Sequence, residues 1–145
     1  MPEIVAGFLV GEGRYEVQGL IDMGGMGSVY HALDLRLGNR PVALKVLHTE
    51  LLADPNANAR MKAEALALSR IRHLNVVGII DCFDVLGRLA LVLEYIPGGA
   101  LRSRVTNGPI GWEQARDLMA QILDGLQAIH DIGLVHRDIK TANVL

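Results

Sequence analysis

Three short segments near the start of the chain have the composition of β-strands. They span residues 15–21, 28–34 and 41–47, and the third is rich in valine, alanine and leucine. The glycine-rich stretch Met23-Gly24-Gly25-Met26-Gly27 separates the first two segments. This order predicts two strands joined by a tight turn and then a third strand, which differs from a strand–helix–strand unit.

A helical period follows the turn signal Asp54-Pro55-Asn56. Apolar residues recur there at intervals of three and four positions, at Met61, Ala65, Leu68 and Ile71, which predicts an amphipathic helix. Two further strands are expected at residues 76–83 and 88–95, joined near Gly87. The sequence Pro97-Gly98-Gly99 should end the second of these strands and form a hinge.

The longest periodic segment covers residues 112–132, and Gly133 is placed to end it as a helix. We interpret its apolar stripe as core: Ala115, Leu118, Met119, Ile122, Leu126 and Ile129. The elements together predict an α+β fold. It should contain a five-stranded antiparallel sheet with one main helix, followed by a hinge and the beginning of a helical lobe.

The bulk properties narrow the class of protein. The 145 residues suit one domain, half of them are hydrophobic, and the net charge of −2 does not favour binding to nucleic acid or to an anionic membrane. No apolar run has the roughly 18 to 20 residues that cross a bilayer. The single cysteine, Cys82, is interpreted as a small buried hydrophobe in a reducing compartment, so we expect a cytoplasmic location.

A charged loop, His136-Arg137-Asp138-Ile139-Lys140-Thr141-Ala142-Asn143, follows the long helix. Asp138 is suited to accept a hydroxyl proton, Lys140 to neutralise a moving phosphoryl group, and Asn143 to hold a metal ion through its amide oxygen. The alternative is a charged turn with no chemical role. No pair of the five histidines has zinc-ligand spacing within a Cys, Asp or Glu cluster, so no zinc site is expected.

These motifs, in this order, resemble the bacterial eukaryotic-like, or Hanks-type, serine/threonine protein kinases from Gly13 to the end of the chain. The resemblance implies a protein-kinase-like fold, with residues 13–96 as small lobe and hinge and residues 97–145 as the start of the large lobe. It implies transfer of the γ-phosphoryl group of ATP, with Mg²⁺, to a serine or threonine of a protein substrate. Lys140, two residues after Asp138, favours that acceptor class over tyrosine.

The same resemblance assigns residues to the nucleotide. Lys45, in Val42-Ala43-Leu44-Lys45, would contact the α and β phosphates and pair with Glu64. Leu93 would be the gatekeeper, with the backbones of Glu94 and Ile96 bonding the edge of the adenine ring. The glycine hairpin and the positions that enclose the adenine complete the set: Ile21, Gly24, Gly25, Gly27, Val29, Ala43 and Leu145.

Two features leave alternatives open. Asp22 stands where the family usually has the first glycine of its hairpin, so it either repels the phosphates or turns to solvent and bonds its own backbone. The 145 residues also contain no Asp-Phe-Gly or Ala-Pro-Glu motif, so we expect the N-terminal portion of a kinase domain. The alternative is a non-catalytic truncated product, or a pseudokinase-like module that binds a nucleotide or a partner.

Overall fold

The computed structural model describes residues 4–48 and 55–145, which divide into two compact units. The first unit contains the described residues up to Arg70 together with Gly78–Tyr95. The second contains Ile71–Val77 and Ile96–Leu145. The predicted turn residue Asp54 lies outside the described residues.

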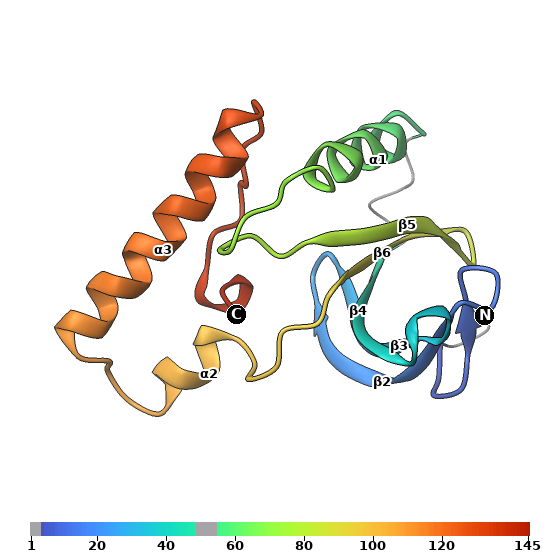
Figure 1. Cartoon of the computed structure of the whole chain (residues 1–145), viewed down its shortest axis with the longest axis horizontal. Helices are drawn as coiled ribbons and strands as arrows, with labels where there is room; N and C mark the ends of the chain where they lie inside the picture. Colours follow the sequence, from blue (N-terminus) through green and yellow to red (C-terminus); the bar gives the residue numbers. More distant parts are fainter. Residues whose placement is uncertain (1–3, 49–54) are drawn as a thin grey trace. The chain divides into compact units, whose positions relative to one another are not determined.

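The first unit is built on a six-stranded antiparallel sheet with the order β1-β2-β3-β4-β6-β5 (Figure 1). Its strands are β1 (Leu9–Val10), β2 (Tyr15–Gly24), β3 (Gly27–Asp34), β4 (Arg40–Leu47), β5 (Ile79–Val85) and β6 (Arg88–Glu94). The five predicted strands are confirmed. The sixth, β1, has only two residues, too few for a pattern to reveal it.

Two predicted strand boundaries were misplaced by three residues. We expected β2 to end at Ile21, but it ends at Gly24. We expected β5 to begin at Val76, but it begins at Ile79, because the residues before Gly78 belong to the second unit. There the backbone turns, and the N–H of Val76 donates to the carbonyl of His73 at 3.2 Å.

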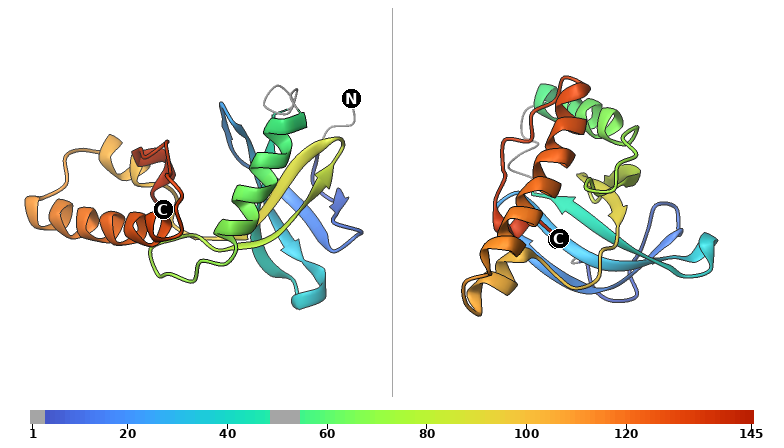
Figure 2. Two further views of the ribbon diagram at one scale, coloured as in Figure 1. Left: turned by 90° about the horizontal axis from the view of Figure 1, so that it is seen from above. Right: turned by 60° about the vertical axis from the view of Figure 1, so that its left-hand side comes forward.

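The predicted amphipathic helix is α1 (Pro55–Leu68), which lies against β5 and β6 (Figures 1 and 2). It begins at Pro55. Proline is favourable at this position because the first N–H group of a helix has no acceptor within the helix, and proline has no N–H. Ile71 does not extend it, because the last turn tightens: the N–H of Arg70 donates to the carbonyl of Ala67, three residues back.

The core of the first unit is formed by alternate residues of the central strands. Val42, Leu44 and Val46 of β4 are fully buried, and Ala90 and Val92 of β6 join them. Side chains along a strand point alternately to opposite faces. The intervening residues of β4, Ala43 and Lys45, therefore lie on the other face of the sheet, and both are partly exposed.

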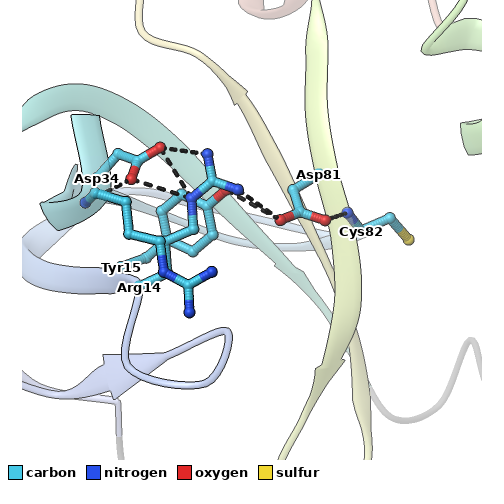
Figure 3. Close-up of polar contacts among 6 residues, drawn as sticks. Arg14, Tyr15, Asp34, Asp81 and Cys82 are labelled. Carbon is cyan, nitrogen blue, oxygen red and sulfur yellow. Dashed lines mark hydrogen bonds and ion pairs between the residues drawn. The ribbon is translucent and has the colours of Figure 1, made fainter.

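A polar network ties β2, β3 and β5 together (Figure 3). Asp34 is buried, and both of its carboxylate oxygens accept hydrogen bonds from the Arg14 guanidinium at 2.6–3.1 Å. The Tyr15 hydroxyl donates to Asp81 at 3.0 Å. The bonds from Arg14 lower the pKa of Asp34 below its ordinary value, whereas burial and the bond to Asp81 raise the pKa of Tyr15.

The interpretation of Cys82 as a buried residue was wrong, because the structure places it at the surface. It pairs with Leu91 of β6, on the face opposite to the buried Val92, and β5 is an edge strand of the sheet. An apolar run in sequence therefore did not mean burial at each of its positions.

The second unit contains α2 (Leu101–Thr106), α3 (Trp112–Asp131) and a short 3₁₀ turn, η3 (Thr141–Asn143). The pattern did not indicate α2, which has only six residues. The prediction of α3 is confirmed, and so is its end: Gly133 has a φ of 77° and its N–H donates to the carbonyl of His130. Leu134 donates to Ile129 at 3.3 Å, which completes a Schellman cap.

The segment Ile71–Val77 packs against the middle of α3. A Cβ atom at Gly125 would come within 2.6 Å of the Asn75 carbonyl oxygen, so only glycine allows this approach. His73 Nε2 lies 3.4 Å from an Asp124 carboxylate oxygen.

The apolar stripe of α3 that we interpreted as core is buried only at Ile129 among its six positions, and Met119 is 54% exposed. None of the described helices is long and apolar enough to cross a membrane.

The buried Asp34 predicts a pH dependence of stability. Its folded-state pKa is depressed, so its stabilising contribution is present above the ordinary carboxyl pKa of 3.8 and is lost as the pH falls through the lower folded value. Asp34→Asn should lower the urea midpoint at neutral pH and reduce its further fall in acid. Asp117→Asn, on the exposed surface of α3, is the control and should leave the pH profile unchanged. An equal acid-induced fall in wild type and Asp34→Asn would contradict this prediction.

Candidate functional site

The glycine-rich stretch forms the tip of the β2–β3 hairpin. The two strands pair as far as Gly24 and Gly27, which leaves Gly25 and Met26 as a two-residue turn. A Cβ at Gly27 would collide with the Val46 carbonyl oxygen of β4, whereas one at Gly25 would meet open space. Packing therefore requires the glycine at position 27, but it does not explain the glycine at position 25.

Asp22 precedes this tip at an irregular point of β2, where the pairing shifts between Leu20 and Asp22. It is exposed, as is the neighbouring Ile21, and its Oδ1 accepts a hydrogen bond from the Met23 N–H at 2.9 Å. Of the two alternatives for Asp22, the structure supports the one in which the side chain bonds its own backbone.

Several of the predicted nucleotide residues share one face of the sheet. Strand pairing sets Val29 directly opposite Lys45, and Ala43 opposite Leu93. Directly opposed side chains lie on the same face, the one opposite to the buried core. Three apolar side chains and one ammonium group, from β3, β4 and β6, thus lie on one face of the sheet.

The expected partners Lys45 and Glu64 belong to β4 and to α1. Glu64 is exposed on α1, and among residues 4–48 and 55–145 no ion pair joins it to Lys45. Lys62, on α1, does form an ion pair with the sheet: its Nζ lies 2.9 Å from a carboxylate oxygen of Asp84 on β5. In this structure the helix is therefore connected to β5 by Lys62.

The predicted hinge residues are divided between the two units. Leu93 and Glu94 end β6, and Glu94 is held by Gly78, which accepts from its N–H at 2.9 Å and donates to its carboxylate at 3.0 Å. Ile96 and Leu145 belong to the second unit. Leu145 is 57% exposed and follows Val144, whose carbonyl accepts from the Leu101 N–H of α2.

In the second unit, the charged loop brings Asp138, Lys140 and Asn143 into direct contact. Lys140 Nζ and Asn143 Nδ2 each lie 3.0 Å from Asp138 Oδ2, and Asn143 Nδ2 also donates to the Asp138 carbonyl at 2.8 Å. The turn η3 makes this possible by folding Asn143 back, with its N–H on the Lys140 carbonyl. Three residues chosen by spacing thus form one cluster.

The electrostatics of this cluster keep Asp138 ionised. The hydrogen bond from Lys140 lowers the pKa of Asp138 most, and that from Asn143 lowers it further. An ionised carboxylate with one oxygen held in place is suited to accept a proton. The amide nitrogen of Asn143 can only donate hydrogen bonds, so Oδ1 is the atom of this side chain that could bind a hard cation such as Mg²⁺.

Sequence reasoning missed how the backbone before Asp138 is arranged. Arg137 has a φ of 64°, which is unusual for a residue with a side chain, and the N–H of Asp138 donates to His136 Nδ1 at 3.3 Å. The same bond occurs between the N–H of Asn75 and His73 Nδ1. Both bonds occur where a histidine is followed two residues later by Asn or Asp, and this repeated spacing is the sequence signal that could have revealed them.

The comparisons with known proteins agree with this fold. A family model described as a protein kinase domain matches residues 15–145. The chain therefore belongs to the protein kinase domain family. Its match begins at the first residue of β2 and includes both the glycine hairpin and the charged loop.

The similar curated proteins include bacterial serine/threonine kinases. The chain is 42% identical over 136 residues to the serine/threonine-protein kinase pkn2 of Myxococcus xanthus, covering 94% of this chain and 16% of that protein. It is 40% identical over 139 residues to PknA of Mycobacterium tuberculosis, covering 92% and 32%. The chain thus spans less than a third of the length of these relatives.

Solved structures show the same fold at lower identity. The kinase domain of Mycobacterium tuberculosis PknI superposes with a TM-score of 0.87 at 22% identity, over 97% of this chain and 56% of the solved one. A double mutant of that domain gives a TM-score of 0.89.

The two glycines of the hairpin should respond differently to substitution. Gly27→Ala should lower the free energy of unfolding by about 2 kcal/mol, because its methyl group must displace the β4 backbone. Gly25→Ala, whose methyl group meets open space, should change stability far less. Urea unfolding of both variants measures this difference, and equal destabilisation would contradict the packing explanation.

The Asp138 cluster predicts a shift that NMR can measure. Lys140→Ala removes the largest cause of the depressed carboxyl pKa, so the pKa of Asp138 should rise toward 3.8. Side-chain carboxyl carbon shifts followed during a pH titration report this value. Lys62→Ala is the matched control, since its partner is Asp84, and it should leave Asp138 unchanged. No rise in Lys140→Ala would exclude the contact.

Proposed function

We propose that this chain is part of a serine/threonine protein kinase that transfers the γ-phosphoryl group of ATP to a hydroxyl of a protein substrate. The observation that carries the proposal is the cluster in which Lys140 Nζ and Asn143 Nδ2 both lie 3.0 Å from the same Asp138 carboxylate oxygen, Oδ2. The family and the bacterial relatives support it. An ionised, oriented carboxylate beside a cation is the arrangement that in-line phosphoryl transfer needs.

Each residue of the cluster would have a separate task. Asp138 would accept the proton of the attacking serine or threonine hydroxyl as its oxygen forms a bond to the γ-phosphorus and the bond to ADP breaks. Lys140 would neutralise negative charge on the transferred group. Asn143 Oδ1 would hold Mg²⁺, which when bound neutralises phosphate charge.

The first unit would bind the nucleotide. The face of the sheet that carries Val29, Ala43 and Leu93 would pack against the adenine, together with Ile21. Lys45, on the same face, would reach the α and β phosphates. The N–H groups of the glycine hairpin, at Gly24, Gly25 and Gly27, would cover the phosphates, and the backbone of Glu94 would bond the edge of the ring.

A second function remains a candidate because of α1. Glu64, the carboxylate that should orient Lys45, is exposed and makes no ion pair with it among the described residues. Transfer requires that pair, whereas nucleotide binding alone does not. The second candidate is therefore a module that binds nucleotide without turnover.

Phosphoryl transfer can be tested after the chain is joined to the C-terminal remainder of the kinase domain of one of its bacterial relatives. We expect radiolabel transfer from ATP to a generic protein substrate. Asp138→Asn should lower kcat by about 10²–10⁴-fold because the proton acceptor is lost. Lys45→Met should also lower kcat strongly, because the phosphates lose their orienting cation.

Matched variants make this test specific. Lys62→Met removes an ammonium from α1, and Asp117→Asn removes a carboxylate from α3, and neither should change kcat. Activity that survives Asp138→Asn unchanged would contradict the assigned role. Binding of ATP without any transfer by the chimeric domain would favour the second candidate.

A further inference from the structure

His48 lies one residue beyond the end of β4 and contacts the glycine hairpin twice. Its backbone N–H donates to the Met26 carbonyl at 3.1 Å, and its ring Nε2 lies 2.9 Å from the Gly24 carbonyl oxygen. Met26 belongs to the turn and Gly24 ends β2. A residue that directly follows β4 thus contacts both Gly24 and Met26 of the hairpin tip, and neither the family motifs nor the charged loop includes it.

The tip is suited to such a contact because β4 runs beside β3 to its very end. Gly27 pairs with Leu47, and the missing Cβ of Gly27 lets the β4 backbone approach closely. The pairing of β3 with β4 therefore places His48 next to the turn. Its side chain only has to cross the two-residue turn to reach Gly24 on β2.

The chemistry of the contact identifies the proton on the ring. A carbonyl oxygen can only accept a hydrogen bond, so Nε2 of His48 must be the nitrogen that donates. The Gly24 carbonyl and the Gly25 N–H belong to one planar trans peptide unit, in which the two groups point in opposite directions. A bond that fixes the carbonyl toward His48 therefore also fixes the direction of the Gly25 N–H, away from His48.

We infer that His48 is a positioning residue for the glycine hairpin: its ring holds the Gly24–Gly25 peptide so that the Gly25 N–H is presented to a nucleotide phosphate. The phosphate part of this inference rests on the proposed function. The absence of any steric need for glycine at position 25 agrees with it, since a backbone that a ligand must approach closely has its own reason to lack a side chain.

The test uses the 145-residue chain with His48→Leu, which removes the ring donor, and His48→Gln, whose amide nitrogen can replace Nε2. Hydrogen exchange of the amides of residues 24–28, measured without nucleotide, reports whether the His48–Gly24 hydrogen bond stabilises the hairpin tip. Loss of one hydrogen bond should speed exchange about fivefold in His48→Leu, and His48→Gln should restore it. His130→Leu, on the exposed surface of α3, is the matched control.

Binding is then compared for ATP with Mg²⁺ and for adenosine by calorimetric titration. His48→Leu should weaken ATP about fivefold and leave adenosine unchanged, because adenosine has no phosphates. Unchanged exchange in His48→Leu, or no recovery in His48→Gln, would contradict the inference that the His48 ring stabilises the hairpin tip. Equal weakening of both ligands would overturn the phosphate role. If the wild-type chain binds neither ligand, the proposed function fails, while the exchange result still decides whether His48 holds the hairpin.

Discussion

The pairing of β4 with β3 on one side and β6 on the other is the constraint on which the first unit depends. Because side chains alternate along β4, the same register that buries Val42, Leu44 and Val46 places Ala43 and Lys45 on the opposite face. A shift of one residue would exchange the two sets and bury an ammonium group in the core. The packing of the core and the position of the candidate nucleotide face are thus determined together.

The second unit arranges its candidate chemistry locally. Asp138, Lys140 and Asn143 lie within six residues of one another, and the turn η3 is enough to bring them into contact. The cluster depends on charge-assisted hydrogen bonds at the surface, where the partners of Asp138 keep it ionised. The two units therefore contribute by different means: a sheet register in one and a short folded loop in the other.

Local contacts were accessible to sequence reasoning when they lay close in the chain. The helix end at Gly133 spans only a few residues, so residue type and spacing were sufficient to predict it. The residues of the Asp138 cluster were also chosen by spacing within one short loop, but their contacts were not predicted. Lys45 and Glu64 are 19 residues apart, and their expected pair is not formed in this structure. The spacing specified which residues could meet, but the placement of α1 decides whether they do.

From its sequence alone, the protein's α+β class, its five main strands, its long helix and its family resemblance could be determined, because apolar periodicity and ordered motifs are properties of the chain itself. Only the tertiary structure showed the exposure of Cys82, the burial of Asp34 under Arg14, the approach of Asn75 to Gly125 and the reach of His48 to Gly24. Each depends on which residues from distant segments become neighbours. That is decided by strand register and helix packing, and neither is encoded in the spacing of any single segment.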